Sequence, residues 1–262
     1  MCETESRITF DLQRVSLFEG LEAPLLERLA RATSCKEAKK GERIYWQGDT
    51  PRAFYFVISG HVRRAMASSE GEEKVIDILS AGRYFGLAEI FGSSAYASFA
   101  EAVEPVVLLR IGKEGLLDAI AESPSLAMKL LQAIAEQQAT FERDVAACFF
   151  QSGCGRLLDY LLREAAPILR ADGDTILELQ ISKRLIAARI GVSAETLSRA
   201  FRELSDADLI AVRGRKIVLR EKLALRQAAR NEGEVGIPQW GRRQSDRWSE
   251  RQRFAGGSRA LM

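Results

Sequence analysis

Residues 194–204, AETLSRAFREL, constrain the fold of this chain more than any other stretch. Wound as an α-helix, they separate into an apolar face that can dock on a core and a polar face left to meet a partner. The apolar face consists of Leu197, Ala200, Phe201 and Leu204. The polar face consists of Glu195, Ser198, Arg199 and Arg202. A carboxylate, a hydroxyl and a guanidinium within one helical turn are groups that read base edges in the major groove of DNA.

The residues around this helix predict a winged helix-turn-helix. Ser182 can cap a preceding helix that runs to about Ile190, and Gly191 supplies a tight turn because glycine adopts positive φ at little cost. Ser193 can cap the second helix. The stretch LIAVRGRKIVLRE then forms two short apolar runs around Gly214, which is the pattern of a hairpin. The alternative is an amphipathic helix pair whose polar face is only solvated.

The charge distribution favours DNA binding. Residues 175–230 carry twelve Lys and Arg against six Asp and Glu, whereas residues 1–174 carry twenty against twenty-six. The formal net charge of +2 is therefore an average over two unlike parts. The positive part is the one that would meet the phosphates of DNA.

Length and composition indicate a two-domain cytoplasmic protein. The 262 residues are 47% hydrophobic, enough for two modest cores. Neither a run of 18 apolar residues nor a signal peptide is evident, so we expect no membrane partner. The four cysteines are scattered, which is typical of a reducing compartment.

Two further patterns complete the domain organisation. Up to about residue 117, short apolar runs alternate with glycines, which predicts a β-sandwich or roll after a helical lead. From Pro124 a long helix follows, with a coiled-coil seam of about three heptads that favours a dimer. The seam residues are Ala127, Leu131, Ile134, Gln138, Phe141, Val145 and Cys148. The alternative is a helix packed on its own domain. Gly153 and Gly155 mark a hinge after it.

Residues 1–225 resemble a transcription regulator of the Crp/Fnr family. Glu195-Thr196-Leu197-Ser198-Arg199 is similar to the E-x-x-S-R pattern of the Fnr branch, and GDTPRAFYFVISGHVRR and EGEEKVIDILSAGRYFG resemble the family's β-roll. The resemblance implies an α+β protein: a cyclic-nucleotide-binding-type β-roll at 1–124, a dimerisation helix at 125–151 and a winged helix-turn-helix at 152–225. Composition predicts a mostly disordered tail at 226–262.

The resemblance also implies partners and contacts. It implies a homodimeric regulator that binds double-stranded DNA at TTGAT-type inverted repeats. As an activator it would also contact RNA polymerase, and repression is the alternative. Arg199 would lie on the guanine, Glu195 on the opposite cytosine and Ser198 near a thymine. We expect the DNA-contacting residues to be Ser193, Glu195, Thr196, Ser198, Arg199, Arg202 and Arg215.

The roll lacks the cation by which family members hold cyclic AMP. No Lys or Arg occurs from Tyr84 to Leu109, and neutral residues 96–99 stand in place of the Arg-Ser pair. Glu89 also lies two residues late for the F-G-E position. A buried phosphate needs a cation or ordered amides, so we expect an effector other than cyclic AMP.

The stretch from Tyr84 to Leu109 (the effector cassette) and AFYFVISG are most similar to the dissimilatory-nitrate-respiration branch, whose members respond to nitric oxide through haem. This implies a sensor of nitric oxide, low oxygen or redox state with an effector pocket between roll and dimer helix. We expect the pocket residues to be Gly86, Leu87, Glu89, Ile90, Phe91 and Phe99. His61, the single histidine, falls on a probable surface strand, so no haem ligand stands out. Cys148 and Cys154 form either a redox pair or two small buried residues.

Two other classes of function are less favoured. A β-roll ligand-binding regulatory protein without DNA affinity would need the missing phosphate cation. An enzyme is disfavoured by the single histidine, the scattered cysteines and the absence of a glycine-rich phosphate loop before a helix.

Overall fold

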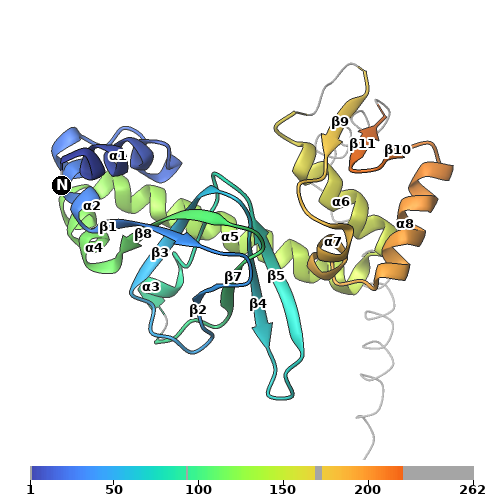
Figure 1. The fold of residues 1–262 in the computed structure, drawn as a ribbon, viewed down its shortest axis with the longest axis horizontal. Helices are drawn as coiled ribbons and strands as arrows, with labels where there is room; N and C mark the ends of the chain where they lie inside the picture. Colours follow the sequence, from blue (N-terminus) through green and yellow to red (C-terminus); the bar gives the residue numbers. More distant parts are fainter. Residues whose placement is uncertain (1, 93, 169–172, 221–262) are drawn as a thin grey trace, which may run out of the picture. The chain divides into compact units, whose positions relative to one another are not determined.

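The computed structural model describes residues 2–92, 94–168 and 173–220, without the side chains of residues 2–6. The chain divides into two compact units (Figure 1). Of the described residues, those within 2–157 and 181–200 form the first unit, and those within 158–180 and 201–220 form the second. The tail predicted to be disordered, 226–262, lies outside the described residues.

Eight strands of the described part of the first unit form two antiparallel sheets, which confirms the predicted β-roll (Figure 1). One sheet has the order β1-β8-β3-β6 and the other has the order β2-β7-β4-β5. The strands are β1 (Thr33–Ala38), β2 (Arg43–Tyr45), β3 (Ala53–Ser59), β4 (Val62–Ala67), β5 (Glu73–Leu79), β6 (Tyr84–Phe85), β7 (Phe99–Ala102) and β8 (Val106–Gly112). A short helix, α3 (Glu89–Gly92), lies between β6 and β7.

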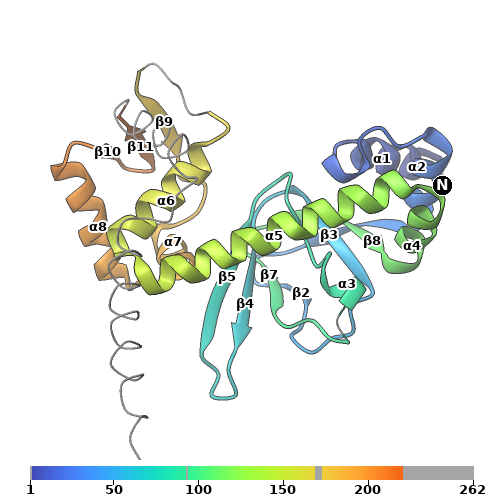
Figure 2. The ribbon, with the colours of Figure 1, turned by 180° about the vertical axis from the view of Figure 1, so that it is seen from behind.

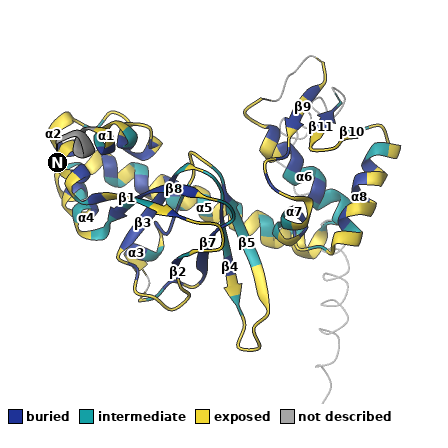
Figure 3. Ribbon diagram, viewed as in Figure 1, coloured by how far each residue is buried: buried dark blue, intermediate teal, exposed yellow. Residues whose placement is uncertain are grey.

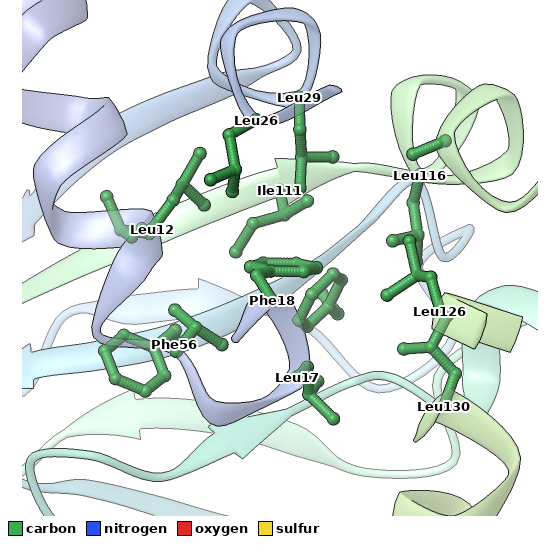
Figure 4. Close-up of a cluster of buried hydrophobic side chains, with 14 of the residues drawn as sticks. Leu12, Leu17, Phe18, Leu26, Leu29, Phe56, Ile111, Leu116, Leu126 and Leu130 are labelled. Carbon is green, nitrogen blue, oxygen red and sulfur yellow. The ribbon is translucent and has the colours of Figure 1, made fainter. Parts of the chain in front are cut away.

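Two apolar clusters stabilise this unit. The interior cluster joins both sheets, and in it the ring of Tyr45 stacks on that of Tyr96 with 3.8 Å between centroids. The outer cluster packs the β1-β8-β3-β6 sheet against four helices and the short turn Ser16–Phe18 (Figure 4). These helices are α1 (Cys2–Gln13), α2 (Ala23–Arg31), α4 (Lys113–Glu122) and α5 (Pro124–Phe150). Burial of these large apolar side chains is the main force that holds helices and sheet together.

Helix α5 lies along the roll (Figure 2). It carries a stripe of exposed apolar side chains that includes Leu131, Phe141 and Val145. Ser123 caps it by accepting a hydrogen bond from the backbone N–H of Leu126. Ile134, a predicted seam residue, packs on the roll's outer cluster instead. Five of the seven predicted seam residues are exposed, namely Leu131, Gln138, Phe141, Val145 and Cys148, whereas Ala127 is half-buried. The use of this face as a dimer seam stays a prediction.

The remaining elements form the helix-turn-helix and its wing. They are α6 (Gly153–Ala165), β9 (Thr175–Glu178), α7 (Lys183–Arg189), α8 (Ala194–Asp206), β10 (Ile210–Arg213) and β11 (Lys216–Leu219). The strands pair in the order β10-β11-β9, so β9 extends the predicted hairpin to three strands. None of the described helices has the length and apolar character needed to cross a bilayer.

Candidate nucleic-acid interface

Helix α8 is capped by a serine as the sequence predicts, and the cap involves two of the predicted DNA contacts. Ser193 Oγ accepts a hydrogen bond from the backbone N–H of Thr196 at 3.0 Å and also lies 2.9 Å from Thr196 Oγ1. Before it, Gly191 has φ of +67°, the left-handed conformation that glycine adopts readily. Ser193 and Thr196 therefore hold the start of the helix, and their hydroxyls are already engaged.

The two faces of α8 separate as the sequence predicts (Figure 3). The buried side chains are Leu197, Ala200, Phe201 and Leu204, each at most 6% exposed. Glu195, Ser198, Arg199 and Arg202 are exposed. Arg199 Nη2 donates to Glu195 Oε1 at 3.3 Å, and the Ser198 hydroxyl donates to the Ala194 carbonyl at 3.0 Å. A rigid helix therefore presents a carboxylate, a hydroxyl and two guanidinium groups to solvent.

The wing carries three exposed cations, Arg213, Arg215 and Lys216, which differ in their contacts. Arg215 donates from Nε to the Leu179 carbonyl at 2.9 Å and from Nη2 to the Gln180 carbonyl at 2.6 Å. This guanidinium therefore fastens the turn to the chain that follows β9, although the Arg215 residue itself is exposed. Arg213 and Lys216, which face each other across the β10–β11 pairing, are exposed and make no ion pair among the described residues. The predicted contact of Arg215 with DNA stays a prediction, and the register of the hairpin adds Arg213 and Lys216 as candidate phosphate contacts.

The six residues predicted to line one effector pocket lie in different surroundings. Leu87 and Ile90 belong to the outer cluster against the helices, and each is at most 1% exposed. Phe99 lies under the Arg43 guanidinium, 3.4 Å from its ring centroid, and Phe91 is 43% exposed. Gly86 is buried with φ of +79°. Only Leu87 and Ile90 thus lie where the roll meets α5, and the effector pocket stays a prediction.

The residue that sequence reasoning missed is Arg64 of β4. Its Nη2 donates to Glu89 Oε1 at 2.6 Å and to the buried Ser98 Oγ at 3.2 Å, while its Nε is buried and has no hydrogen-bond partner. Burial raises the pKa of the neighbouring Tyr45 to about 12, so its phenol stays protonated. The cation absent from the cassette is thus supplied by another strand, and Glu89 neutralises it. The sequence signal for this buried cation is the pair of consecutive arginines, Arg63 and Arg64, on one strand. Because side chains alternate between the faces of a strand, one of the two must point into the roll.

His61 and the described cysteines lie outside the apolar clusters of the roll. His61 Nδ1 lies 2.5 Å from Glu104 Oε1, and neither residue belongs to the two apolar clusters. No group of three or more His, Cys, Asp or Glu in the described part is placed to hold a metal ion. Cys148 and Cys154 are not joined by a disulfide. Among the described residues, therefore, no histidine or cysteine belongs to either apolar cluster, where a haem would be buried.

Comparisons with known proteins agree with this architecture. A model of the cyclic nucleotide-binding domain matches residues 35–123, and a model of the Crp-like helix-turn-helix domain matches residues 155–228. The chain belongs to the Crp/Fnr family of DNA-binding transcription regulators.

The relatives are distant but cover most of the chain. A CRP-like cAMP-activated global transcriptional regulator of Mycobacterium tuberculosis is 23% identical over 220 residues, which are 84% of this chain and 98% of the relative. A global nitrogen regulator of Synechococcus elongatus is 27% identical over 197 residues, covering 73% and 88%. The structure of FixK2 from Bradyrhizobium japonicum superposes with a TM-score of 0.65 at 23% identity, covering 74% of this chain and 96% of that one, which shows the shared fold.

Proposed function

We propose that the protein is a homodimeric transcription regulator that reads TTGAT-type inverted repeats through α8. The supporting observation is the exposed set Glu195, Ser198 and Arg199 on one face of a capped helix whose opposite face is buried. Arg forks onto guanine, carboxylate accepts from the cytosine amino group, and the hydroxyl serves either way. Because one such helix reads only a half-site, two copies related by a two-fold axis read the inverted repeat. Activation then requires a contact with RNA polymerase.

The signal that we propose is nitric oxide, low oxygen or a redox change, and not cyclic AMP. Two cassette residues that stand near the position of the family's Arg-Ser pair are neutral and already bonded. Tyr96 donates to the Ala53 carbonyl at 2.5 Å, and Ser98 accepts from Arg64. Arg64, the cation inside the roll, is paired with Glu89, so a phosphate would have to displace an internal carboxylate.

A second candidate function is a roll that responds to another small effector. The buried Nε of Arg64 and the buried hydroxyl of Tyr45 favour it, because these groups interact inside the roll without a hydrogen bond of good geometry, and a small polar effector could complete their hydrogen bonding. Calorimetric titration separates these possibilities. We expect cyclic AMP to give no heat of binding with the wild-type protein. Binding of another small anion to the wild type, lost in Arg64→Met, would support the second candidate.

The DNA claim is tested by fluorescence anisotropy on a TTGAT-N4-ATCAA duplex against a scrambled duplex at the same salt. The titration is run anaerobically, with and without a nitric oxide donor. A preference for the inverted repeat supports the role of α8, and a change with the donor supports the gas signal. Equal affinity for both duplexes under every condition contradicts the proposed function.

A further inference from the structure

Arg189, at the end of α7, bonds this helix to two other elements of the first compact unit, α5 and β5. Its Nη2 donates to Asp144 Oδ2 of α5 at 2.7 Å, and its Nε donates to Asp77 Oδ1 of β5 at 3.2 Å. The Arg189 side chain is only 16% exposed. All three residues belong to the first compact unit, in which α7 packs against β5 (Figure 1). The guanidinium uses two of its donor positions within the protein, which distinguishes it from the exposed cations of α8.

Asp77 is also the cross-strand neighbour of Arg64. The β4–β5 register pairs these two positions. Burial lowers the pKa of Arg64, and its interactions with Tyr45, Glu89 and then Asp77 outweigh that effect and raise it. Arg64 in turn binds Glu89, which lies in α3 between β6 and β7. Charges therefore alternate in sign along Glu89, Arg64, Asp77 and Arg189, from the effector cassette to the helix-turn-helix.

This arrangement gives Arg64 two acidic neighbours and Asp77 two basic ones. While Glu89 neutralises Arg64, the Asp77 carboxylate remains available to Arg189. If Glu89 is withdrawn, Arg64 keeps a buried positive charge, and a buried charge without a partner is unfavourable. Asp77 is the other carboxylate near Arg64, so its interaction with Arg189 weakens. A local change in the cassette is thereby converted into a looser attachment of α7.

We propose that Arg189 is a positioning residue through which the state of the Glu89–Arg64 pair is transmitted to the helix-turn-helix. This inference rests on the proposed DNA-binding function for its effect on affinity, but not for the coupling itself. The proposed route crosses β5 and α7 and involves neither the exposed stripe of α5 nor the predicted hinge at Gly153. The effector need only compete for Arg64 or Glu89 to act on it.

A double-mutant cycle on DNA affinity tests the route in the full-length protein. We expect Asp77→Asn and Arg189→Gln each to change the dissociation constant for the specific duplex by about 3- to 10-fold, in the same direction, and the double variant to change it no further. Glu89→Gln should shift affinity in that direction too. Glu72→Gln removes an equal charge from the exposed β4–β5 turn and should leave affinity unchanged. Unchanged affinity in folded Asp77→Asn, or effects that multiply in the double variant, would overturn the proposal.

A second readout does not depend on DNA. Hydrogen exchange of residues 183–189 should accelerate in Glu89→Gln, although the substitution lies in the roll, and it should remain as in the wild type in Glu72→Gln. Wild-type exchange in Glu89→Gln contradicts the coupling even if DNA binding is intact. Conversely, failure of the wild type to bind the duplex, with accelerated exchange in Glu89→Gln, would contradict the proposed function and leave the coupling supported. Arg189→Lys keeps the charge but cannot bond to Asp77 and Asp144 at once, so it should show part of the change in DNA affinity expected for Arg189→Gln.

Discussion

Glu195 Oε1 accepts a hydrogen bond from Arg199 Nη2 at 3.3 Å, one turn further along α8. The side chains are 84% and 65% exposed, and an exposed pair of this spacing contributes only about 0.3–0.5 kcal/mol. A bidentate contact of Arg with guanine discriminates by about 1–3 kcal/mol. Breaking the Glu195–Arg199 ion pair on DNA therefore costs less free energy than the contact with guanine provides. In the absence of DNA, the pair keeps the guanidinium along the exposed face of α8.

Arg199→Ala should weaken specific binding by about 1–3 kcal/mol, roughly 5- to 150-fold, and relax the preference at the guanine. The measurement is anisotropy on the consensus duplex and on one with the guanine replaced. Arg202→Ala, an exposed cation on the same helix, serves as the control and should keep the base preference. Equal loss on both duplexes in Arg199→Ala would assign Arg199 to the phosphates instead.

The wing cations should divide into two kinds. Arg213→Ala should weaken binding to all sequences alike and reduce the slope of log affinity against log salt by about 1, because it removes one phosphate contact. Arg215→Ala should instead lower thermal stability, because it deletes the hydrogen bonds to the Leu179 and Gln180 carbonyls. A salt slope measured for each variant, together with its melting temperature, decides between them. An altered slope with unchanged stability in Arg215→Ala contradicts this division.

Local sequence pattern predicted the parts of the site that depend on one segment. The faces of α8, the Ser193 cap and the Gly191 turn follow from helical periodicity and from the conformations that serine and glycine favour. The partners of Arg64, Arg189 and Arg215 come from segments far away along the chain, so no local pattern could name them. For the same reason the helical period did not show that Ile134 of the predicted seam packs on the roll, since tertiary packing decides which face the roll covers.

Gly153 allows the start of α6 to approach α8 closely. A Cβ at Gly153 would lie 2.8 Å from Thr196 Cγ2, whereas a Cβ at Gly155 meets nothing nearer than 3.5 Å. Gly153→Ala should therefore cost about 1–3 kcal/mol by overpacking and displace the capped start of α8. Gly155→Ala, within the same helix, should be neutral or stabilise by up to about 1 kcal/mol. Thermal unfolding and DNA affinity measured on both variants check this, and a Gly153→Ala variant as stable as the wild type would contradict the close approach.

The exposed stripe on α5 predicts where a second copy docks. Leu131 is 59% exposed and Val145 is 39% exposed, although both are large apolar side chains. Leu131→Glu combined with Val145→Glu should place charges in the shared seam, weaken dimerisation at least about tenfold and reduce binding to the inverted repeat. Gln132→Glu adds a charge at an exposed position beside the stripe and should leave the dimer intact. Sedimentation velocity over a concentration series distinguishes these outcomes. A wild-type monomer, or a dimer that survives both glutamates, would show that this stripe is not the contact between copies, because a dry apolar seam does not tolerate facing carboxylates.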